Sequence, residues 1–174
     1  MSEKLIKRDE IYNGKVIKVH KDTIEINNEE YLREVVEHPG GVGIALNDHG
    51  KYFMVKQFRY ALQTYTIEYP AGKREMGEDD LSTAKREIVE EVGYTGKNWM
   101  YLGEMYPTPA YDTETIGMYY ADCDEFVGQH FDDDEDIEVM MMSLDEIESL
   151  IKDGTIKDAK TIVMTYMIKE KVNG

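Results

Sequence analysis

The stretch from Asp79 to Gly93 constrains the fold of this chain more than any other. It contains no proline and has helix-forming composition, with Asp79 and Asp80 placed to cap the start of a helix and Gly93 placed to end it. Its apolar residues recur at helical spacing, at Leu81, Ala84, Ile88 and Val92. That spacing puts them in one stripe, so the sequence predicts a helix that packs one side against a core.

A neighbouring side of the same helix carries clustered acids. Glu87 and Glu91 stand four residues apart, and Glu90 lies one turn from Glu87, with Lys85 and Arg86 as the nearby basic residues. Like charges at this spacing destabilise a helix by roughly 0.2 to 0.5 kcal/mol per pair. Mg²⁺ binds oxygen ligands, usually carboxylates together with water and substrate phosphates. The patch therefore indicates either a solvated acidic face or a metal site that handles phosphates.

The flanking residues favour the second interpretation. Gly72 is followed at fixed intervals by Glu78, Arg86-Glu87-Ile88, Glu90-Glu91 and Gly93-Tyr94. This pattern resembles the signature of the Nudix hydrolases, and every fixed position of the family pattern is met. The resemblance implies an α/β/α sandwich with a mixed sheet. It also implies a reaction, the hydrolysis of a diphosphate that is linked to another group.

The resemblance further implies roles for the residues of the signature. The metal ligands would be the backbone carbonyl of Ala71 and the carboxylates of Glu87, Glu90 and Glu91. Arg86 would orient these glutamates, Glu90 would also assist catalysis, and Glu78 would support the preceding loop. Gly72 and Gly93 would let the backbone turn. The expected ion is Mg²⁺, for which Mn²⁺ may substitute.

Residues outside the signature narrow the substrate. Pro109 lies sixteen residues after Gly93, and a proline at that offset resembles the ADP-ribose pyrophosphatase branch of the family. Further branch-like stretches are residues 11–16, 55–59, 68–73 and 158–161. The branch often has Ser-Pro-Gly where this chain has Thr108-Pro109-Ala110, which affects the expected pocket around the terminal sugar. The resemblance implies that ADP-ribose is cleaved to AMP and ribose 5-phosphate.

Other functions stay open at this point. They are cleavage of another nucleotide sugar such as GDP-mannose, cleavage of a nucleoside polyphosphate, and a non-catalytic module that senses nucleotides. The general base is expected in the acidic loop of residues 132–136, where resemblance of the following residues points to Glu135. A solvated acidic loop is the alternative interpretation of that segment.

The expected substrate-binding residues are Tyr12, Arg33, Arg59 and Pro109. Arg59 would face the nucleotide or its phosphates, because a guanidinium can stack on a base and pair with an anion. Tyr12 would stack on adenine, although an aromatic side chain on a strand also fits plain packing. Members of this branch are typically dimers that exchange N-terminal strands, so the resemblance implies a homodimer whose subunits complete each other's nucleotide pocket.

The rest of the chain predicts a β lobe followed by a larger domain. Alternating apolar and polar residues over 5–37 predict antiparallel strands, and the break at His38–Gly41 places the boundary between a lobe of residues 1–40 and a Nudix domain of residues 41–174. Further strands are predicted over residues 42–46, 52–58, 99–105, 115–123 and 138–142. One helix is predicted to begin at Ser143, and another to cover 158–171 with Ile162, Val163, Tyr166 and Met167 as its apolar residues.

Composition limits the partners and the compartment. The formal charge of −16, from 20 basic and 36 acidic residues among 174, should repel nucleic acid and anionic membranes. Cys123 is the only cysteine, so no intrachain disulfide can form. The N-terminal residues contain no apolar signal core, and no apolar run reaches the length of a membrane span. We therefore expect a cytoplasmic enzyme that acts on a small nucleotide sugar.

Overall fold

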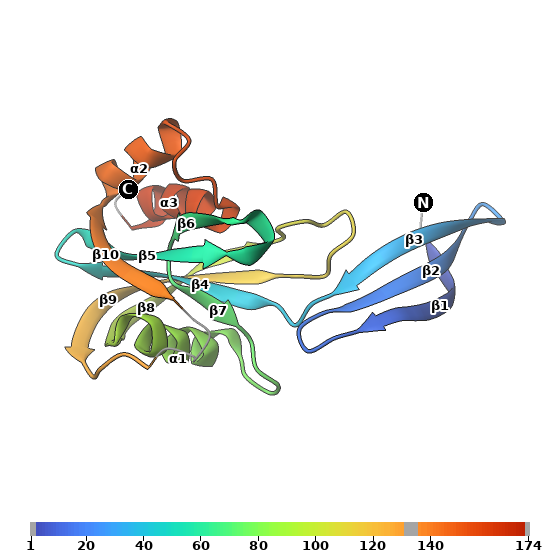
Figure 1. Cartoon of the computed structure of the whole chain (residues 1–174), viewed down its shortest axis with the longest axis horizontal. Coiled ribbons are helices and arrows are strands. Elements are labelled where there is room, and N and C mark those ends of the chain that lie inside the picture. The colour runs from blue at the N-terminus through green and yellow to red at the C-terminus, as the bar shows by residue number, and fades with distance from the viewer. Residues whose placement is uncertain (1–2, 131–135, 173–174) are drawn as a thin grey trace. The chain divides into compact units, whose positions relative to one another are not determined.

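The structure is a computed structural model that describes residues 3–130 and 136–172. Its elements fall into two compact units, one formed by residues 1–40 and 106–115 and the other by residues 41–105 and 116–174. The first unit contains a three-stranded sheet of β1 (Lys4–Asn13), β2 (Lys18–Ile26) and β3 (Glu29–Glu37) (Figure 1). All its neighbouring strands are antiparallel, which confirms the prediction from the alternating pattern.

Local turn chemistry sets the register of this sheet. Asn27 and Asn28 both have positive φ, 53° and 64°, between β2 and β3. Two such residues in succession are typical of a type I′ hairpin turn, and asparagine tolerates that backbone well. In the same unit the turn that contains Pro109 is attached to β3, because Val36 N–H donates to the Tyr111 carbonyl at 2.7 Å.

The second unit is built on a seven-stranded mixed sheet. Its strands are β4 (Gly41–Asp48), β5 (Lys51–Arg59), β6 (Thr64–Glu68), β7 (Ala71–Lys73), β8 (Tyr94–Met105), β9 (Ile116–Phe126) and β10 (Ile137–Ser143). The main order is β10-β5-β4-β9-β8, while β6 pairs with β5 and β7 pairs with β4. The β4–β9 pair is parallel and the other pairs are antiparallel. A short 3-10 turn, η1 (Tyr60–Leu62), joins β5 to β6.

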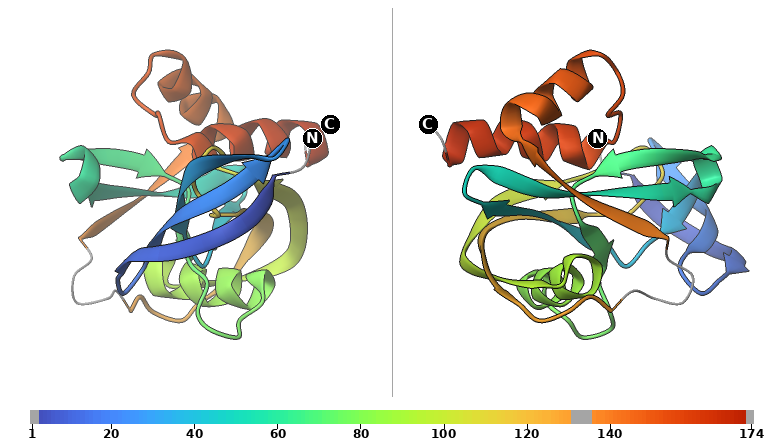
Figure 2. Two further views of the ribbon diagram at one scale, coloured as in Figure 1. Left: turned by 90° about the vertical axis from the view of Figure 1, so that its right-hand side faces the viewer. Right: turned by 60° about the vertical axis from the view of Figure 1, so that its left-hand side comes forward.

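Helices cover both faces of this sheet. Helix α1 (Asp80–Val92) lies on one face, and α2 (Leu144–Lys152) and α3 (Ala159–Lys171) lie on the other (Figures 1 and 2). Ala84 and Ile88 of α1 pack in one core with Ile44 of β4, whereas Met164 and Ile168 of α3 pack in a second core. The expected α/β/α sandwich is therefore confirmed. In the described part of the chain, none of the helices is long and apolar enough to cross a membrane.

The predicted helix caps are present. The Asp79 carboxylate accepts a hydrogen bond from Ser82 N–H at 3.0 Å, and Gly93 ends α1 with a φ of 82°. Ser143 and Glu146 form a reciprocal capping box at the start of α2. The caps at Asp79 and Gly93 fix where α1 begins and ends, and so they fix the position of its acidic residues relative to the sheet.

Helix α3 buries only part of its predicted apolar set. Ile162 and Tyr166 are exposed, whereas Met164 and Ile168 are fully buried. The buried face also contains the polar residues Lys160, Thr161 and Thr165. The prediction was therefore right for Val163 and Met167, which are partly buried against this core, and wrong for Ile162 and Tyr166.

Candidate active site

Helix α1 places three glutamates beside the backbone of β7. Glu91 is only 3% exposed, and its Oε2 accepts a hydrogen bond from Ala71 N–H at 3.1 Å. The Glu87 carboxylate lies directly against Gly72, where a Cβ atom would overlap it. Gly72 is therefore required for a close approach of side chain and backbone, and the helix and the strand together define one acidic surface.

Arg86 links the acidic groups to one another. Its Nη1 donates to Glu87 Oε1 and to Glu90 Oε2, both at 2.8 Å. Its Nε and Nη2 donate to the two oxygens of Glu78 at 3.0 and 2.9 Å, and Nη2 also donates to the Lys73 carbonyl at 3.1 Å. These hydrogen bonds raise the pKa of Arg86. One guanidinium thus donates hydrogen bonds to three carboxylates.

Glu78 holds the loop before α1. Besides Arg86, it accepts hydrogen bonds from Glu75 N–H at 3.2 Å and from the Thr83 hydroxyl at 3.0 Å. The hydrogen bonds from Arg86 lower the pKa of Glu78 to about 2, against a smaller opposing effect of burial. Glu78 is therefore ionised at neutral pH and is fully used as an acceptor within the loop. Its side chain supports Arg86 and does not face an open site.

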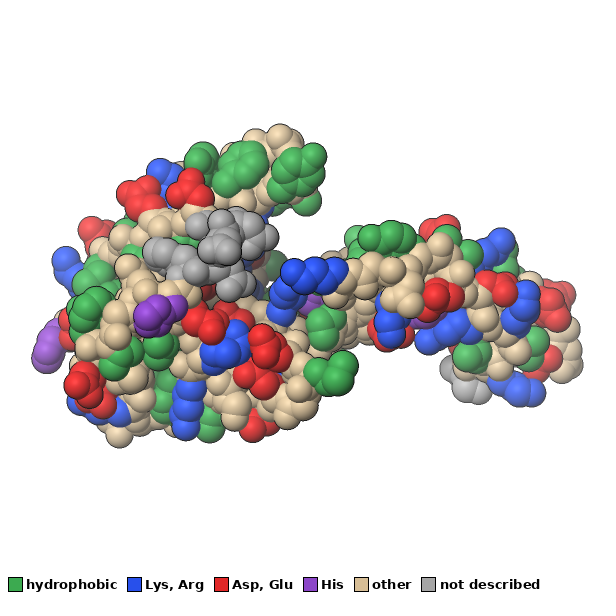
Figure 3. Space-filling view, turned by 60° about the horizontal axis from the view of Figure 1, so that its bottom comes forward, with side chains coloured by type: hydrophobic (Ala, Val, Ile, Leu, Met, Phe, Trp, Pro, Cys, Tyr) green, Lys and Arg blue, Asp and Glu red, His purple; other side chains and the backbone are tan. Residues whose placement is uncertain are grey.

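The acidic surface suits a hard cation by its donor chemistry. Glu87, Glu90 and Glu91 offer carboxylate oxygens from two successive turns of one helix, which are the ligands that Mg²⁺ prefers. Among residues 3–130 and 136–172, no three acidic, histidine or cysteine side chains converge closely enough to hold an ion as they stand. Arg86 Nη1 bridges Glu87 and Glu90 instead. The space-filling view shows acidic side chains beside a basic one on the unit that carries α1 (Figure 3).

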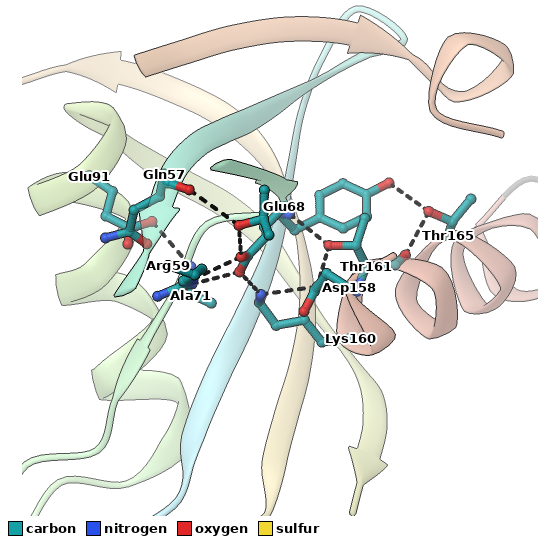
Figure 4. Close-up of polar contacts among 11 residues, drawn as sticks. Gln57, Arg59, Glu68, Ala71, Glu91, Asp158, Lys160, Thr161 and Thr165 are labelled. Carbon is teal, nitrogen blue, oxygen red and sulfur yellow. Dashed lines mark hydrogen bonds and ion pairs between the residues drawn. The ribbon is translucent and has the colours of Figure 1, made fainter. Parts of the chain in front are cut away.

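Arg59 belongs to a second polar cluster, next to the first. Its Nε and Nη2 donate to the two oxygens of Glu68 at 2.8 and 2.6 Å (Figure 4). Glu68 also accepts hydrogen bonds from the Thr66 hydroxyl and from Lys160 Nζ. The pairing with Glu68 raises the pKa of Arg59, and the Glu91 carboxylate adds to that effect. Arg59 is therefore affected electrostatically by Glu91 of α1, while its side chain remains 39% exposed.

The start of α3 anchors this cluster. Asp158 Oδ2 accepts hydrogen bonds from Lys160 Nζ at 3.0 Å and from Thr161 N–H at 2.8 Å. The Thr161 hydroxyl in turn accepts from Tyr69 N–H at 3.1 Å, and both Tyr69 and Thr161 are fully buried. The N-terminus of α3 is thus tied to the strand residues that lead into Ala71 and Gly72.

Three of the expected substrate-binding residues lie in the other unit. Tyr12 is exposed on β1, with its ring over Gly14. Arg33 on β3 pairs with Glu3 at 2.8 and 3.1 Å, and it lines a shallow pocket with Lys21, Leu32, Glu34, Ala110 and Tyr111. Pro109 is exposed in the turn that Asp112 N–H closes on the Thr108 carbonyl at 3.1 Å. The expected general base, Glu135, lies outside the described residues.

Sequence reasoning did not assign roles to Glu68, Lys160 or Asp158. These residues occur in stretches 68–73 and 158–161, which resemble the ADP-ribose pyrophosphatase branch. That resemblance marked the two stretches without showing that they meet. The two stretches are far apart in the sequence, and they meet only because α3 packs against the sheet. A local sequence pattern therefore does not predict their contact.

Comparison with known proteins agrees with this geometry. A family model described as "NUDIX domain" matches residues 37–163. The chain is 38% identical to the ADP-ribose pyrophosphatase of Bacillus subtilis, over 92% of this chain and 89% of that protein. It is 37% identical to the methanol dehydrogenase activator of Bacillus methanolicus, over 96% and 92% of the two chains. It is 30% identical to the GDP-mannose pyrophosphatase of Yersinia enterocolitica, over 90% of each.

A solved structure has the same fold. The crystal structure of an ADP compounds hydrolase superimposes with a TM-score of 0.88, covering 100% of this chain and 96% of that chain. The two sequences are 17% identical. This likeness therefore concerns the arrangement of the strands and helices.

Proposed function

The chain belongs to the Nudix family, and on that premise we propose that it hydrolyses the diphosphate bond of ADP-ribose or of a related nucleoside diphosphate sugar. From ADP-ribose the products are AMP and ribose 5-phosphate. The observation that carries the proposal is the acidic surface of α1, where Arg86 orients Glu87 and Glu90 beside the backbone of Gly72. The Bacillus subtilis relative supports ADP-ribose as the substrate.

The proposed cofactor is Mg²⁺, with Mn²⁺ as a substitute. Glu87, Glu90, Glu91 and the Ala71 carbonyl are the groups that would hold it. When bound, the ion supplies neutralisation of phosphate charge and a more acidic water. Arg86 keeps the carboxylates in place, and Ala71 N–H fixes Glu91 from the strand side. The protein's own contribution is therefore a set of carboxylate oxygens that Arg86 and the strand backbone hold along one helix.

Arg59 is the proposed phosphate-binding side chain. Glu68 occupies its Nε and Nη2, and Nη1 has no hydrogen-bond partner within the described ranges. A guanidinium that is held along one edge presents its other donors in a fixed direction. The Glu91 carboxylate contributes to the raised pKa of Arg59, which supports a phosphate site near the acidic surface.

Glu135 is the proposed general base. The described residues just before it lie at the end of α1, because His130 N–H donates to the Glu90 carbonyl at 3.1 Å. Gln129 Nε2 donates to the Glu91 carbonyl at 3.1 Å. Gln129 and His130, which precede the acidic segment in the sequence, therefore lie beside the last turn of α1, which carries Glu90 and Glu91.

Replacement of this base tests its role. We expect Glu135→Gln to lower kcat by roughly 10² to 10⁴ with the fold intact, as for loss of a general base. Asp136→Asn is the matched control and should stay close to the parent. A kcat for Glu135→Gln within about threefold of the parent would reject the assignment, and a loss confined to Asp136→Asn would move the role to that residue.

The proposed assembly is a homodimer in the cytoplasm. In it, N-terminal strands of residues 1–40 are exchanged, so that Tyr12 and Arg33 of one subunit complete the nucleotide pocket of the Nudix domain, residues 41–174, of the other. Tyr12 is exposed on β1 and Arg33 lines a pocket, so both can meet a ligand. Light scattering combined with size-exclusion chromatography measures the assembly, and a monomeric mass at micromolar concentration would contradict it.

Product analysis tests the reaction. The purified protein is incubated with Mg²⁺ and, separately, ADP-ribose, GDP-mannose, UDP-glucose, NADH and ATP, with a Glu91→Gln control. We expect AMP and ribose 5-phosphate from ADP-ribose and none from the control. Turnover of another compound keeps the Nudix chemistry and changes the substrate. Inactivity towards all of them would favour the nucleotide-sensing module.

Two relatives support other candidates within the same bond class. The GDP-mannose pyrophosphatase relative supports GDP-mannose as a substrate. The methanol dehydrogenase activator relative supports a second candidate, stimulation of a dehydrogenase. Addition of the protein to an NAD-dependent alcohol dehydrogenase assay separates this candidate, because stimulation by the Glu91→Gln variant would show an effect that does not need hydrolysis.

A further inference from the structure

We propose that Lys160 is a positioning residue, which acts through Glu68 to hold the Arg59 guanidinium in the orientation that meets the substrate diphosphate. The inference rests on the proposed function, because it takes Arg59 to be the phosphate-binding side chain. Lys160 lies on the first turn of α3, is only 6% exposed, and directs its Nζ to Glu68 and Asp158 (Figure 4). It comes from the opposite side of the sheet to the signature helix.

The hydrogen bonds of Glu68 show why Lys160 matters. Glu68 is 2% exposed. Its Oε1 accepts from Arg59 Nε and the Thr66 hydroxyl, and its Oε2 accepts from Arg59 Nη2 and Lys160 Nζ. A carboxylate has about four acceptor positions, so every one is used. The plane of the carboxylate is therefore fixed from both sides, and the Arg59 fork that pairs with it is fixed as well.

The balance of charge gives Lys160 a role that packing alone does not. Arg59 and Lys160 face Glu68 and Asp158, two cations with two anions. Without Lys160, Arg59 would be the remaining cation in the cluster, against both of these anions and the nearby Glu91. A buried charge that loses its partner is strongly unfavourable. Arg59 would be drawn towards the interior and away from the diphosphate.

The alternative explanation for the burial of Lys160 is that its side chain only fills space. Its stem passes Gly43 of β4, where a Cβ atom would lie 3.8 Å from Lys160 Cδ. Methionine matches this stem in length and lacks the charge, so Lys160→Met keeps the packing and removes the ammonium group. The substitution therefore separates the two functions.

Steady-state kinetics with ADP-ribose provides the test. We expect Lys160→Met to raise KM roughly tenfold with kcat nearly unchanged, the effect of a weakened charge-assisted contact to the phosphates. Glu68→Gln should raise KM similarly, and the double variant should be no worse than either single variant, because Lys160 acts through Glu68. The double variant also keeps the cluster balanced in charge, so it carries the test if Lys160→Met does not fold.

The control is Lys169→Met, on the same helix. Lys169 pairs with Glu148 and its side chain is half exposed. The KM of the Lys169→Met variant should therefore equal that of the parent. A KM for Lys160→Met within about twofold of the parent would overturn the proposal, and so would additive effects in the double variant.

A pH profile distinguishes positioning from stability. Burial raises the pKa of Glu68, and in Lys160→Met only one cation, Arg59, remains to lower it. Asp158 and Glu91 add negative charge nearby. Protonation of Glu68 should then begin at a higher pH, and kcat/KM should fall on the acid side where that of the parent does not. An unchanged profile, together with a lower melting temperature, would assign Lys160 a purely structural role.

Binding without turnover separates this inference from the proposed function. The dissociation constant of ADP-ribose in EDTA is measured by calorimetry for the same variants. If the parent binds ADP-ribose without hydrolysing it, and Lys160→Met binds ADP-ribose more weakly than the parent, the positioning role is kept and the hydrolysis is rejected. A parent that neither binds ADP-ribose in EDTA nor turns it over with Mg²⁺ would reject both, whereas active variants with parental KM would reject the positioning role alone.

Discussion

Replacement of Gly72 by alanine isolates the contact between β7 and the signature helix. Gly72 does not have a positive φ, so its backbone would accept an alanine. The obstacle is the side chain, because a Cβ atom at this position would overlap the Glu87 carboxylate. Glu87 would have to move, and it would lose its hydrogen bond from Arg86 Nη1 at 2.8 Å. Overpacking of this kind costs about 1 to 3 kcal/mol, which we expect as the loss in the free energy of unfolding.

Gly50→Ala is the matched control. Gly50 has a φ of +86° and no atom lies within 4 Å of a Cβ built there. Its replacement costs backbone strain of about 1 to 2 kcal/mol. The two variants should therefore lose similar stability for different reasons. Their activities should differ, because only Gly72→Ala displaces a proposed metal ligand.

The assay combines urea denaturation with Mg²⁺ titration of ADP-ribose hydrolysis. For Gly72→Ala we expect the half-saturating Mg²⁺ concentration to rise about 10- to 100-fold, as for disturbed metal-site geometry. Gly50→Ala should keep the parental value. A Gly72→Ala variant with parental Mg²⁺ dependence would show that the position of Glu87 against the backbone is unimportant for the site.

Three further predictions concern stability. Burial would raise the pKa of Glu68, but its pairing with Arg59 and Lys160 lowers it from 4.5 to about 2. A lowered folded-state pKa gives stability that is present above pH 4.5 and lost as the pH falls through 2. The deficit of Glu68→Gln in urea denaturation, about 3 kcal/mol at neutral pH, should therefore shrink across that window, and a constant deficit would contradict this reasoning. Asp79→Ala should cost about 1 kcal/mol through loss of the α1 cap, measured by thermal denaturation against Asp145→Ala as a control. Ile88→Ala should cost about 2 to 5 kcal/mol, and a loss below 1 kcal/mol would mean that the core relaxes around the cavity.

The elements with strong local signals were predicted well. The caps Asp79 and Gly93 and the spacing of Ala84 and Ile88 define α1 by themselves, and the structure has this helix within one residue of the prediction. The family was predicted from the signature on that helix, and the match of the family model confirms it. The strands β6 and β7 were not predicted, because β7 has only three residues and is defined by its pairing with β4.

The site was predicted only as far as local spacing reaches. Arg86 and Glu90 stand four residues apart on one helix, so their contact follows from a turn of 3.6 residues. The partner of Arg59 could not be found this way. Glu68 meets Arg59 across neighbouring strands and meets Lys160 across the packing of α3 on the sheet. A buried lysine also contradicts the usual apolar pattern of a helix face, which is why the buried side of α3 was predicted only in part.

Helix α1 has to serve the core and the site with the same thirteen residues. Ile88 faces the core and Glu90 faces the open side, so their substitutions should affect stability and activity separately. Glu91 lies at the border, because it is buried and yet is a proposed metal ligand. Its Oε2 accepts a hydrogen bond from Ala71 N–H on the strand, which lowers the cost of burying this carboxylate. The burial of Glu91 and its hydrogen bond from Ala71 N–H therefore attach a proposed metal ligand on the helix to a strand of the sheet.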